Sequence, residues 1–438
     1  MKAFIEDWRG AWLSLLCGVA VVFAFSQAWQ CPLFGYNNEQ STAAGAIIRV
    51  FYYPFYGCGA YLAWKSGMRI VDATWRTGIL LALLALCAAS VVWSIDPSGT
   101  LRRLVALFMT VLCAYAMAAR FSWRRLSEVL AVSFGIMTIA SLILCVAVPS
   151  MGRMTELFPG AWRGVWIEKN ALGTYMAIGF TTFVAAAVEN PTRRWLWSFM
   201  AAMAVGMVLM STSKTALVCC MIGVAGASFV VLTRRGPILG IVLTWLAACT
   251  VLVMVGVVIA VPDKLFLLLG KDPTLTGRTF IWDGIRRVMA DRPLLGYGYG
   301  VVWTDEDLYA PLNKITNVAH FRAFHAHSAW YEVWLGMGKV GLTIWSCLFA
   351  ELWIKGFYRT FRGTGGVFAL PMIAIYGLSS LTESLALGYN DLHWFLAAML
   401  LVKLSLPDDV DAQQADDVVV QAEVVHFSDR RAVVARVG

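Results

Sequence analysis

Apolar segments close to the length that spans a lipid bilayer recur along almost the whole chain of 438 residues. Hydrophobic residues make up 59% of the sequence and charged residues only 14%, more apolar surface than a soluble domain of this size can cover. The pattern predicts an all-α, polytopic integral membrane protein with about twelve transmembrane helices. The expected spans are residues 11–29, 43–64, 78–93, 104–119, 127–147, 171–189, 196–211, 215–232, 237–261, 338–354, 366–386 and 391–406.

Short basic clusters fill every second connection between the expected spans. Lys and Arg concentrate in short cytoplasmic loops, so this alternation predicts that both termini are cytoplasmic. The first span has no clear small-residue cleavage site, and we expect it to be retained in the mature protein. The clusters are Lys65, Arg69 and Arg76; Arg120, Arg124 and Arg125; Arg193 and Arg194; Arg234 and Arg235; and Lys355, Arg359 and Arg362.

One connection, residues 262–328, is a long polar loop that holds three of the five histidines. Long solvated loops held by a rigid scaffold commonly carry binding and catalytic residues. We therefore expect a membrane domain over residues 1–406 whose catalytic loop is 262–328. Residues 407–438 are acidic and contain no apolar span, which predicts a largely disordered cytoplasmic tail without activity. On the predicted orientation, the catalytic loop faces the periplasm from a bacterial inner membrane.

The predicted outer connections also carry cations. Arg163 and Lys169 lie in the connection 148–170, Lys214 lies at the outer boundary of a span, and Arg278 lies in the long loop. Long loops escape the positive-inside bias, which is one account of these residues. As a set they favour an anionic ligand, because guanidinium groups suit phosphate oxygens. Arg278 is the strongest choice: Gly277 lets the backbone approach a ligand, and the amphipathic segment 279–289 could lie on the membrane surface.

No metal or nucleotide motif is visible in the sequence. His325 and His327 could form a pair of metal ligands, but no third ligand follows at a suitable spacing. Nearly all cysteines fall inside expected spans, where they act as small apolar residues. The glycines of residues 296–300 do not follow a strand of a dinucleotide-binding fold. We therefore expect no cofactor, no metal and no nucleic-acid partner.

Six further residues allow two interpretations each. Arg49, Glu351 and Glu383 fall within expected spans, where they could pair with one another or line a water-filled cavity. Tyr297, Tyr299 and Trp303 could stack on sugar rings or anchor the loop at the membrane interface. The sequence does not decide between these roles.

Six short segments follow one another along most of the chain, at residues 93–103, 162–173, 211–216, 275–282, 292–298 and 325–342. Together they resemble the O-antigen ligase/Wzy-C superfamily of polytopic glycan transferases, and within it the exopolysaccharide polymerase (ExoQ-like) branch. Each segment alone is weak, whereas the ordered set is fairly specific. The family commonly has His-Asn where this chain has His327-Ser328, and serine replaces only part of the amide's hydrogen-bonding capacity.

The resemblance implies transfer of a glycan from undecaprenyl pyrophosphate to an acceptor hydroxyl at the periplasmic face, without a metal or nucleotide. Such a reaction needs cations for the departing pyrophosphate and a base for the acceptor proton. His327 is the expected base, because a histidine side chain is mostly neutral at ambient pH, and His325 is expected to support it. The expected pyrophosphate-binding residues are Arg278, Arg163, Lys169 and Lys214.

The interpretation that we favour is polymerisation of lipid-linked repeats in exopolysaccharide or O-antigen biosynthesis. The acceptor is then a second lipid-linked glycan, and a chain-length regulator is a candidate partner. A ligase would instead use lipid A core as the acceptor. A transporter or flippase for a lipid-linked sugar is the rival from another class, although no inverted repeat is plain in the sequence. A non-catalytic scaffold of a polysaccharide assembly complex is a third hypothesis.

Overall fold

The computed structural model describes residues 8, 10–36, 42–156, 158–260, 277–304, 307, 310–362 and 365–407. Within these ranges every regular element is a helix, and the one β-type pairing is an isolated bridge between Arg153 and Trp162. The predicted all-α class is therefore confirmed. Apart from residue 407, the predicted tail lies outside the described residues, as does the first part of the predicted catalytic loop.

The helices follow the apolar segments of the sequence closely. They are α2 (Trp12–Phe25), α3 (Gln30–Phe34), α4 (Thr42–Phe51), α5 (Tyr53–Ser66), α6 (Met68–Trp75), α7 (Gly78–Ala89), η1 (Ser90–Val92), α8 (Pro97–Arg120), α9 (Trp123–Ala147), α10 (Pro149–Gly152), α11 (Lys169–Glu189), η2 (Pro191–Arg193), α12 (Arg194–Ser211), α13 (Lys214–Thr233), α14 (Pro237–Ala260), α16 (Arg278–Val288), η3 (Val302–Thr304), α17 (Pro311–Ala319), α18 (Ala329–Thr360), α19 (Gly366–Thr382) and α20 (Leu392–Ser405).

Among the residues that the structure describes, six segments are long and apolar enough to cross a membrane: α8, α9, α11, α13 and α18, and η2 together with α12. A seventh crossing results if the bent pair Met68–Trp75 and Gly78–Val92, at 83° to each other, counts as one span. The chain is thus a polytopic membrane protein, but the predicted number of about twelve spans is not confirmed. Four apolar helices are shorter than a bilayer-crossing helix, namely Trp12–Phe25, Pro237–Thr250, Gly366–Thr382 and Leu392–Ser405, and the expected span 43–64 is divided between α4 and α5.

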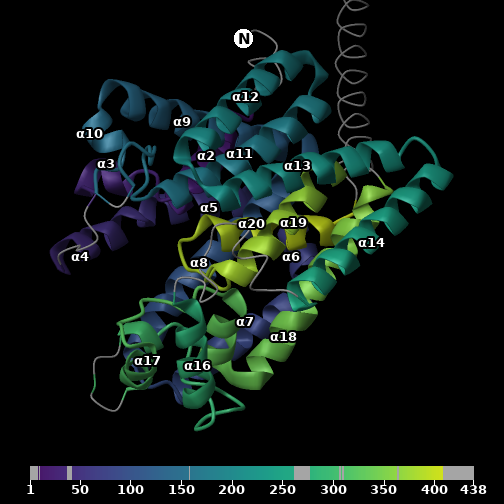
Figure 1. Ribbon diagram of the computed structural model, residues 1–438. Helices are drawn as coiled ribbons and strands as arrows, with labels where there is room; N and C mark the ends of the chain where they lie inside the picture. Colours follow the sequence, from purple (N-terminus) through teal and green to yellow (C-terminus); the bar gives the residue numbers. More distant parts are fainter. Residues whose placement is uncertain are drawn as a thin grey trace, which may run out of the picture. The chain divides into compact units, whose positions relative to one another are not determined.

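α11 lies at the centre of a group of packed helices. It packs against α9, α12, α13 and α19 (Figure 1). α8 packs against α5 and α20, while α18 packs against α7, α19 and α20. A helix that is apolar on all sides is expected to be enclosed by others. The short helices α19 and α20 meet this expectation. α19 contacts both α11 and α18, and α20 contacts both α8 and α18.

The connections that were predicted to be cytoplasmic contact one another. Lys403 Nζ donates to the Phe121 carbonyl over 2.6 Å, and Arg234 Nε donates to the Thr360 carbonyl over 3.1 Å. Near the amino terminus, Trp8 Nε1 donates to Glu128 over 3.2 Å. These bonds tie together segments that are far apart in the sequence but share the basic-cluster pattern.

The connections that were predicted to lie on the outer face form a second set. Trp166 Nε1 donates to the Ser26 carbonyl over 2.8 Å, and Trp93 Nε1 donates to the Leu295 carbonyl over 2.9 Å. These bonds join segments that are far apart in the sequence. Which group faces the periplasm remains a prediction.

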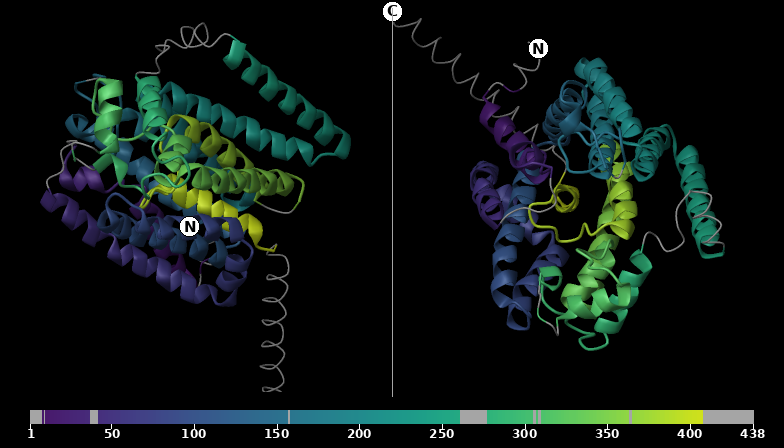
Figure 2. Two further views of the ribbon diagram at one scale, coloured as in Figure 1. Left: turned by 90° about the horizontal axis from the view of Figure 1, so that it is seen from below. Right: turned by 60° about the vertical axis from the view of Figure 1, so that its left-hand side comes forward.

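The described part of the long loop forms a small folded unit, called here the polar cap (residues 277–304 and 310–328). α16 and α17 lie side by side in all views (Figures 1 and 2). Ile281 and Ile285 of α16 form a buried core with Ile315 and Ala319 of α17. The expectation that segment 279–289 lies on the membrane surface is therefore wrong, because its apolar face is covered by α17.

The glycine-rich segment 296–300 joins the polar cap to the membrane helices. Tyr297 N–H and Gly298 N–H donate to the carbonyls of Leu335 and Gly336 over 3.1 and 2.9 Å. Gly298 has a φ of +103°, and a Cβ there would lie 2.6 Å from Ser94 Oγ, so only glycine fits without displacing that neighbour. The motif is a packing device that joins the polar cap to α18.

Candidate functional site

The two histidines of interest lie on a tightly held turn between α17 and α18. Ala326 is fully buried, and its N–H donates to Glu332 Oε1 over 2.7 Å. Its carbonyl accepts from Trp282 Nε1 over 2.8 Å. His327 has a φ of +51°, a left-handed conformation that is costly for a residue with a Cβ. The bonds on both sides of Ala326 keep the turn in this conformation, and strained residues held this way are frequent at functional sites.

Glu383 is shared by the strongest predicted arginine and the predicted base. Arg278 Nη2 lies 3.1 Å from Glu383 Oε1, and its Nη1 donates to the Thr382 carbonyl. His327 Nδ1 lies 3.5 Å from Glu383 Oε2. Burial raises the pKa of Glu383, but His327 and Arg278 together lower it by more, so the net pKa lies below the usual value. The carboxylate is therefore a stable anion behind the imidazole.

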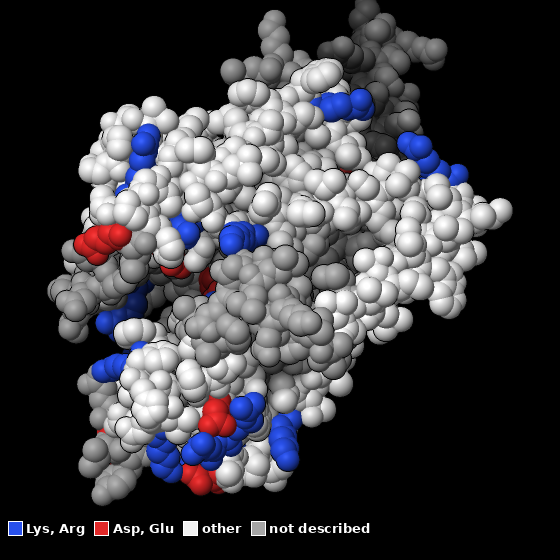
Figure 3. Space-filling view, in the orientation of Figure 1, with Lys and Arg blue, Asp and Glu red and all other residues white. Residues whose placement is uncertain are grey.

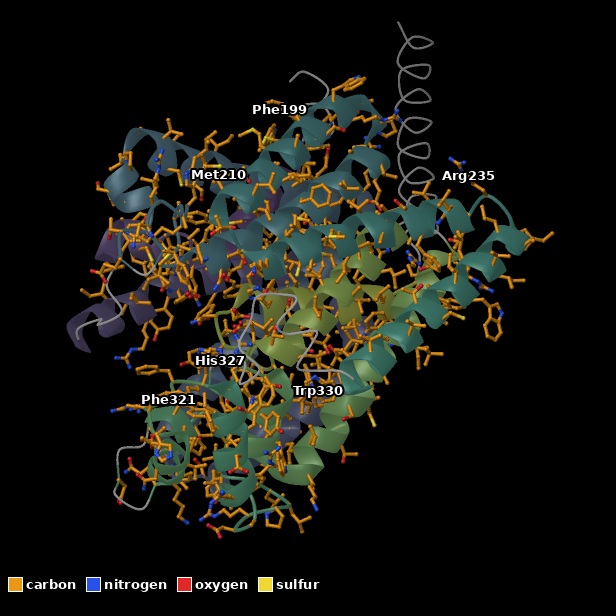
Figure 4. The ribbon with its side chains drawn as sticks, viewed as in Figure 1. Phe199, Met210, Arg235, Phe321, His327 and Trp330 are labelled. Atoms are coloured by element: carbon orange, nitrogen blue, oxygen red, sulfur yellow. The ribbon has the colours of Figure 1, made fainter. Side chains whose placement is uncertain are left out.

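The geometry assigns different surroundings to the two histidines. Their ring centroids are 3.9 Å apart. Burial, with the nearby His327, lowers the pKa of His325 to about 4, so that His325 is neutral across the physiological range. His327 turns Nδ1 toward Glu383, which leaves Nε2 as the nitrogen that can face a substrate. His327 lies between the polar cap and the helices of the bundle (Figure 4).

Two predicted lysines lie near this cluster. Lys169 begins α11, and its Nζ donates to Thr212 Oγ1 over 3.2 Å and lies 3.6 Å from the Phe158 ring centroid. Lys214 begins α13 and is near enough to interact electrostatically with Lys169. Partial burial and the Glu383 charge raise the pKa of Glu168, which precedes Lys169. These electrostatic interactions indicate that Glu168 and the two lysines lie near Glu383.

The exposed face near this cluster is hollowed. Figure 3 shows a recess between the polar cap and the helices above it, with acidic and basic side chains at its edge. Both signs of charge therefore meet at one opening. Within the described ranges, no group of three or more His, Cys, Asp and Glu side chains is placed to hold a metal ion.

Arg163 has contacts of a different kind. Its Nε donates to the Met151 carbonyl over 2.8 Å, and its guanidinium lies 4.1 Å from the centroid of the Tyr36 ring. The Tyr36 hydroxyl in turn donates to the Gly164 carbonyl over 2.8 Å. These contacts hold the connection between α9 and α11 together. Among the predicted site residues, the structure thus gathers Arg278, His325, His327, Lys169 and Lys214, while Arg163 serves the local fold.

Two carboxylates of the site carry no definite prediction from the sequence, which leaves the role of Glu383 open and does not single out Glu332. Glu383 was placed inside a span, whereas α19 ends at Thr382 and leaves Glu383 in the following loop. An acid in an apolar segment was the signal that could have found it. Glu332, which holds the histidine turn and accepts from Trp303 Nε1 over 2.8 Å, had no such signal. The other flagged charges are local: Glu351 pairs with Lys355, and Arg49 bonds within its own helix.

The two loop tyrosines have neither of the roles considered from the sequence. Tyr297 and Tyr299 are buried, and their hydroxyls donate to the carbonyls of Val288 and Leu387 over 2.8 and 2.6 Å. They are core residues whose polar ends are satisfied. Because both residues are buried, neither can anchor the loop at an interface or stack on a sugar at the loop surface, although Tyr299 also lines a cavity next to the histidine turn.

Comparison with known proteins gives three similarities. Residues 199–346 match the family described as O-antigen ligase. The chain is 26% identical over 277 residues to the exopolysaccharide production protein ExoQ of Rhizobium meliloti (strain 1021), with 60% of this chain and 62% of that protein covered. The chain thus spans less than two thirds of this curated relative. The matched family segment contains Lys214, Arg278 and both histidines.

A solved structure described as "Structural coordination of polymerization and crosslinking by a peptidoglycan synthase complex" is also similar. It is 18% identical, and the comparison covers 75% of this chain and 94% of the other. The TM-score is 0.36, which is too low for the likeness to bear on fold or function.

Proposed function

We propose that this chain, which belongs to the O-antigen ligase superfamily, is a membrane glycosyltransferase that uses an undecaprenyl-pyrophosphate-linked glycan at the periplasmic face. The observation that carries the proposal is the Glu383 carboxylate, which Arg278 and His327 share. A carboxylate behind an imidazole, with cations beside both, suits removal of a proton next to a departing anion. We favour a polymerase over a ligase, because the matched relative is named for exopolysaccharide production.

The proposed base is His327 Nε2. It takes the proton of the acceptor hydroxyl as that oxygen bonds to the anomeric carbon of the donor glycan. The bond from the anomeric carbon to the phosphate oxygen breaks, and its electron pair leaves with undecaprenyl pyrophosphate. Glu383 stabilises the imidazolium that forms, as a carboxylate does behind the histidine of a catalytic triad. The imidazolium afterwards returns its proton to solvent.

The departing pyrophosphate is met by fixed cations. Arg278 keeps N–H donors beyond those used for Glu383 and Thr382, because a guanidinium has several in a rigid fork. Lys169 and Lys214 add two ammonium groups from the starts of α11 and α13. Helix starts also carry partial positive charge. We propose that these groups replace a metal ion, so that transfer is metal-independent.

The test is polymer formation by the purified protein in proteoliposomes supplied with lipid-linked repeat. Arg278→Ala is expected to lower the rate about a hundredfold, because losing one donor to a developing anion typically costs about 3 kcal/mol. Arg278→Lys should restore little of it, since lysine cannot make a two-point contact. The matched control is Arg235→Ala, at the α13–α14 turn and away from His327 in Figure 4.

The same assay separates the rival functions. Transfer should persist in excess EDTA; loss in EDTA and recovery with a divalent cation would contradict the cation-only mechanism. Movement of labelled lipid-linked repeat across the bilayer without any new glycosidic bond would indicate a flippase instead. Product on lipid A core, and none on lipid-linked repeat, would identify a ligase.

A further inference from the structure

A cavity of about 220 Å³ lies next to the histidine turn. Its walls come from the glycine-rich segment, the first turns of α18 and the loop between α19 and α20, residues 383–391. His325, Glu332, Ser384 and Tyr389 are among the polar residues that line it. This volume is large enough for many water molecules and for one sugar ring.

Polar atoms without partners are concentrated at this cavity. The buried His325 Nδ1 makes no hydrogen bond, and the buried Ser384 Oγ makes none of normal geometry, although it lies beside the Glu332 carboxyl group. Buried polar atoms are costly unless a partner satisfies them. Each Glu332 oxygen already accepts one bond but has a second lone pair to offer. The cavity therefore presents one donor or acceptor hydroxyl, one imidazole nitrogen and one carboxylate within a small volume, a set that suits sugar hydroxyls.

The charge of the cavity excludes the donor pyrophosphate. None of the described residues that line it is Lys or Arg, and Glu332 gives it an acidic wall. An anionic group would meet a carboxylate there without a compensating cation. A ring with free hydroxyls and no charge meets no such penalty. The ligand class is therefore a neutral pyranose.

The wall of the cavity is also rigid. The Tyr299 hydroxyl donates to the Leu387 carbonyl over 2.6 Å. Tyr56 donates to Asn390 Oδ1 over 2.6 Å, and Asn390 N–H donates to Thr110 in the middle of α8 over 2.9 Å. The loop is thus fixed from three separate helices or segments. A preformed wall binds its ligand at little cost in conformational entropy.

Sequence neighbours connect the cavity to the proposed chemistry. Glu383 faces His327, and the next residue, Ser384, lines the cavity. Likewise His327 faces Glu383, and His325, two residues before it, lines the cavity. A ring held in the cavity would therefore lie beside the base rather than beside Lys169 and Lys214.

We propose that this cavity binds the single neutral sugar ring of the acceptor that carries the attacking hydroxyl. The proposal rests on the function proposed above. His325, Glu332 and Ser384 hold the hydroxyls of the ring, and the hydroxyl nearest to His327 becomes the nucleophile. Donor and acceptor then meet different groups at the histidine turn: the donor meets the cations, and the acceptor meets the lining of the cavity, which contains no Lys or Arg among its described residues.

The first test is sugar binding by saturation-transfer difference NMR on the purified protein in nanodiscs. The probes are the methyl glycosides of glucose and galactose, with methyl glucuronoside as the charged comparison. We expect signals from at least one neutral glycoside and none from the uronoside. Ala386→Phe, which fills the cavity, should abolish the signal, while Ser346→Ala, a serine on the exposed side of α18, should leave it unchanged. Absence of signal from both neutral glycosides would overturn the proposal.

The second test uses transfer with labelled lipid-linked repeat as the acceptor. Ser384→Ala should raise the acceptor KM about tenfold, the usual effect of one lost hydrogen bond, and leave binding of undecaprenyl pyrophosphate unchanged. An unchanged acceptor KM in Ser384→Ala, with a folded Ala386→Phe variant still binding sugar, would contradict the acceptor cavity. Sugar binding without any transfer by the wild type would instead contradict the proposed function and leave the cavity assignment standing.

Discussion

Two arginine–carboxylate pairs, Arg193 with Glu128 and Arg278 with Glu383, differ in what surrounds them. In the pair of Arg193 with Glu128, the side chains are only 8% and 3% exposed, and Trp8 engages the other Glu128 oxygen. In the pair of Arg278 with Glu383, the side chains are 23% and 45% exposed, and the second oxygen faces His327. The same two residue types thus make a closed structural contact in one place and an open one in the other.

The difference shows what distinguishes a structural ion pair from a working one. A fully enclosed pair has no room for a ligand, and breaking it leaves a buried charge without a partner. A half-open pair can exchange one contact for a ligand, and the second carboxylate oxygen of this pair faces a histidine. The open pair also lies beside a strained turn, whereas the enclosed pair joins regular helices.

The largest expected effect is on the open pair. His327→Ala should lower transfer by about a hundredfold to ten-thousandfold, the usual contribution of a positioned base, while undecaprenyl pyrophosphate still binds. Native mass spectrometry measures the bound lipid, and the proteoliposome assay measures transfer. His320→Asn is the control, because His320 is an exposed histidine with a φ of +63° that asparagine tolerates. Wild-type activity in His327→Ala would remove the base from the proposed mechanism.

The enclosed pair should respond in stability instead. Arg193→Ala leaves the buried Glu128 charge unpaired, which typically costs about 3–5 kcal/mol. We expect a clear fall in Tm and in the amount of folded protein, while the molecules that do fold keep their transfer rate. Thermal unfolding in detergent, followed by activity per folded molecule, measures both. A normal Tm combined with lost activity would mean that the two pairs do not differ in the way described here.

A matched pair of amide substitutions sharpens the comparison further. Glu383→Gln keeps the shape of the side chain but removes the charge behind His327, and it should lower transfer about tenfold to a hundredfold. Glu128→Gln should leave the transfer rate per folded molecule unchanged. The measurement is the transfer rate at saturating substrate in both variants. Equal rates in Glu383→Gln and wild type would show that the carboxylate does not assist the histidine.

Local sequence patterns predicted the helices well, because each apolar run is long and uninterrupted. They did not predict the number of spans, because burial within the bundle lets α19 and α20 be short. Their 17 and 14 residues correspond to about 25 and 21 Å, less than the hydrocarbon core of a bilayer. The same shortness places Glu383 in a loop rather than in a membrane span. Hydropathy alone cannot show where an apolar helix ends.

The site was predicted in part for a similar reason. Arg278 and the histidines lie in recognisable motifs of one polar segment. Glu383 and Glu332 reach them only through tertiary contacts, which no spacing in the sequence encodes. Arg163 also sits in a recognisable motif, but its guanidinium is occupied by backbone carbonyls and the Tyr36 ring. A motif therefore identified which residues matter without separating those that build the site from those that support it.

The smallest expected effect is on how the stability of the fold depends on pH, through His325 beside the Arg278–Glu383 pair. Burial holds the pKa of His325 near 4 in the folded protein, below its ordinary value of 6.5. Between these values the unfolded chain binds a proton that the folded chain refuses, so stability falls as the pH drops from about 6.5 to 4. The lowered pKa of Glu383 acts in the same direction at lower pH.

His325→Asn removes the first of these contributions. Its Tm should therefore decline less steeply than that of the wild type over this pH range, whereas the exposed His320→Asn should follow the wild type. Thermal unfolding of the three proteins in detergent at a series of pH values gives the comparison. Parallel curves for wild type and His325→Asn would mean that His325 takes up protons freely in the folded state. His325 would then be open to solvent, and it could not form part of the enclosed cavity wall that we propose for the acceptor sugar.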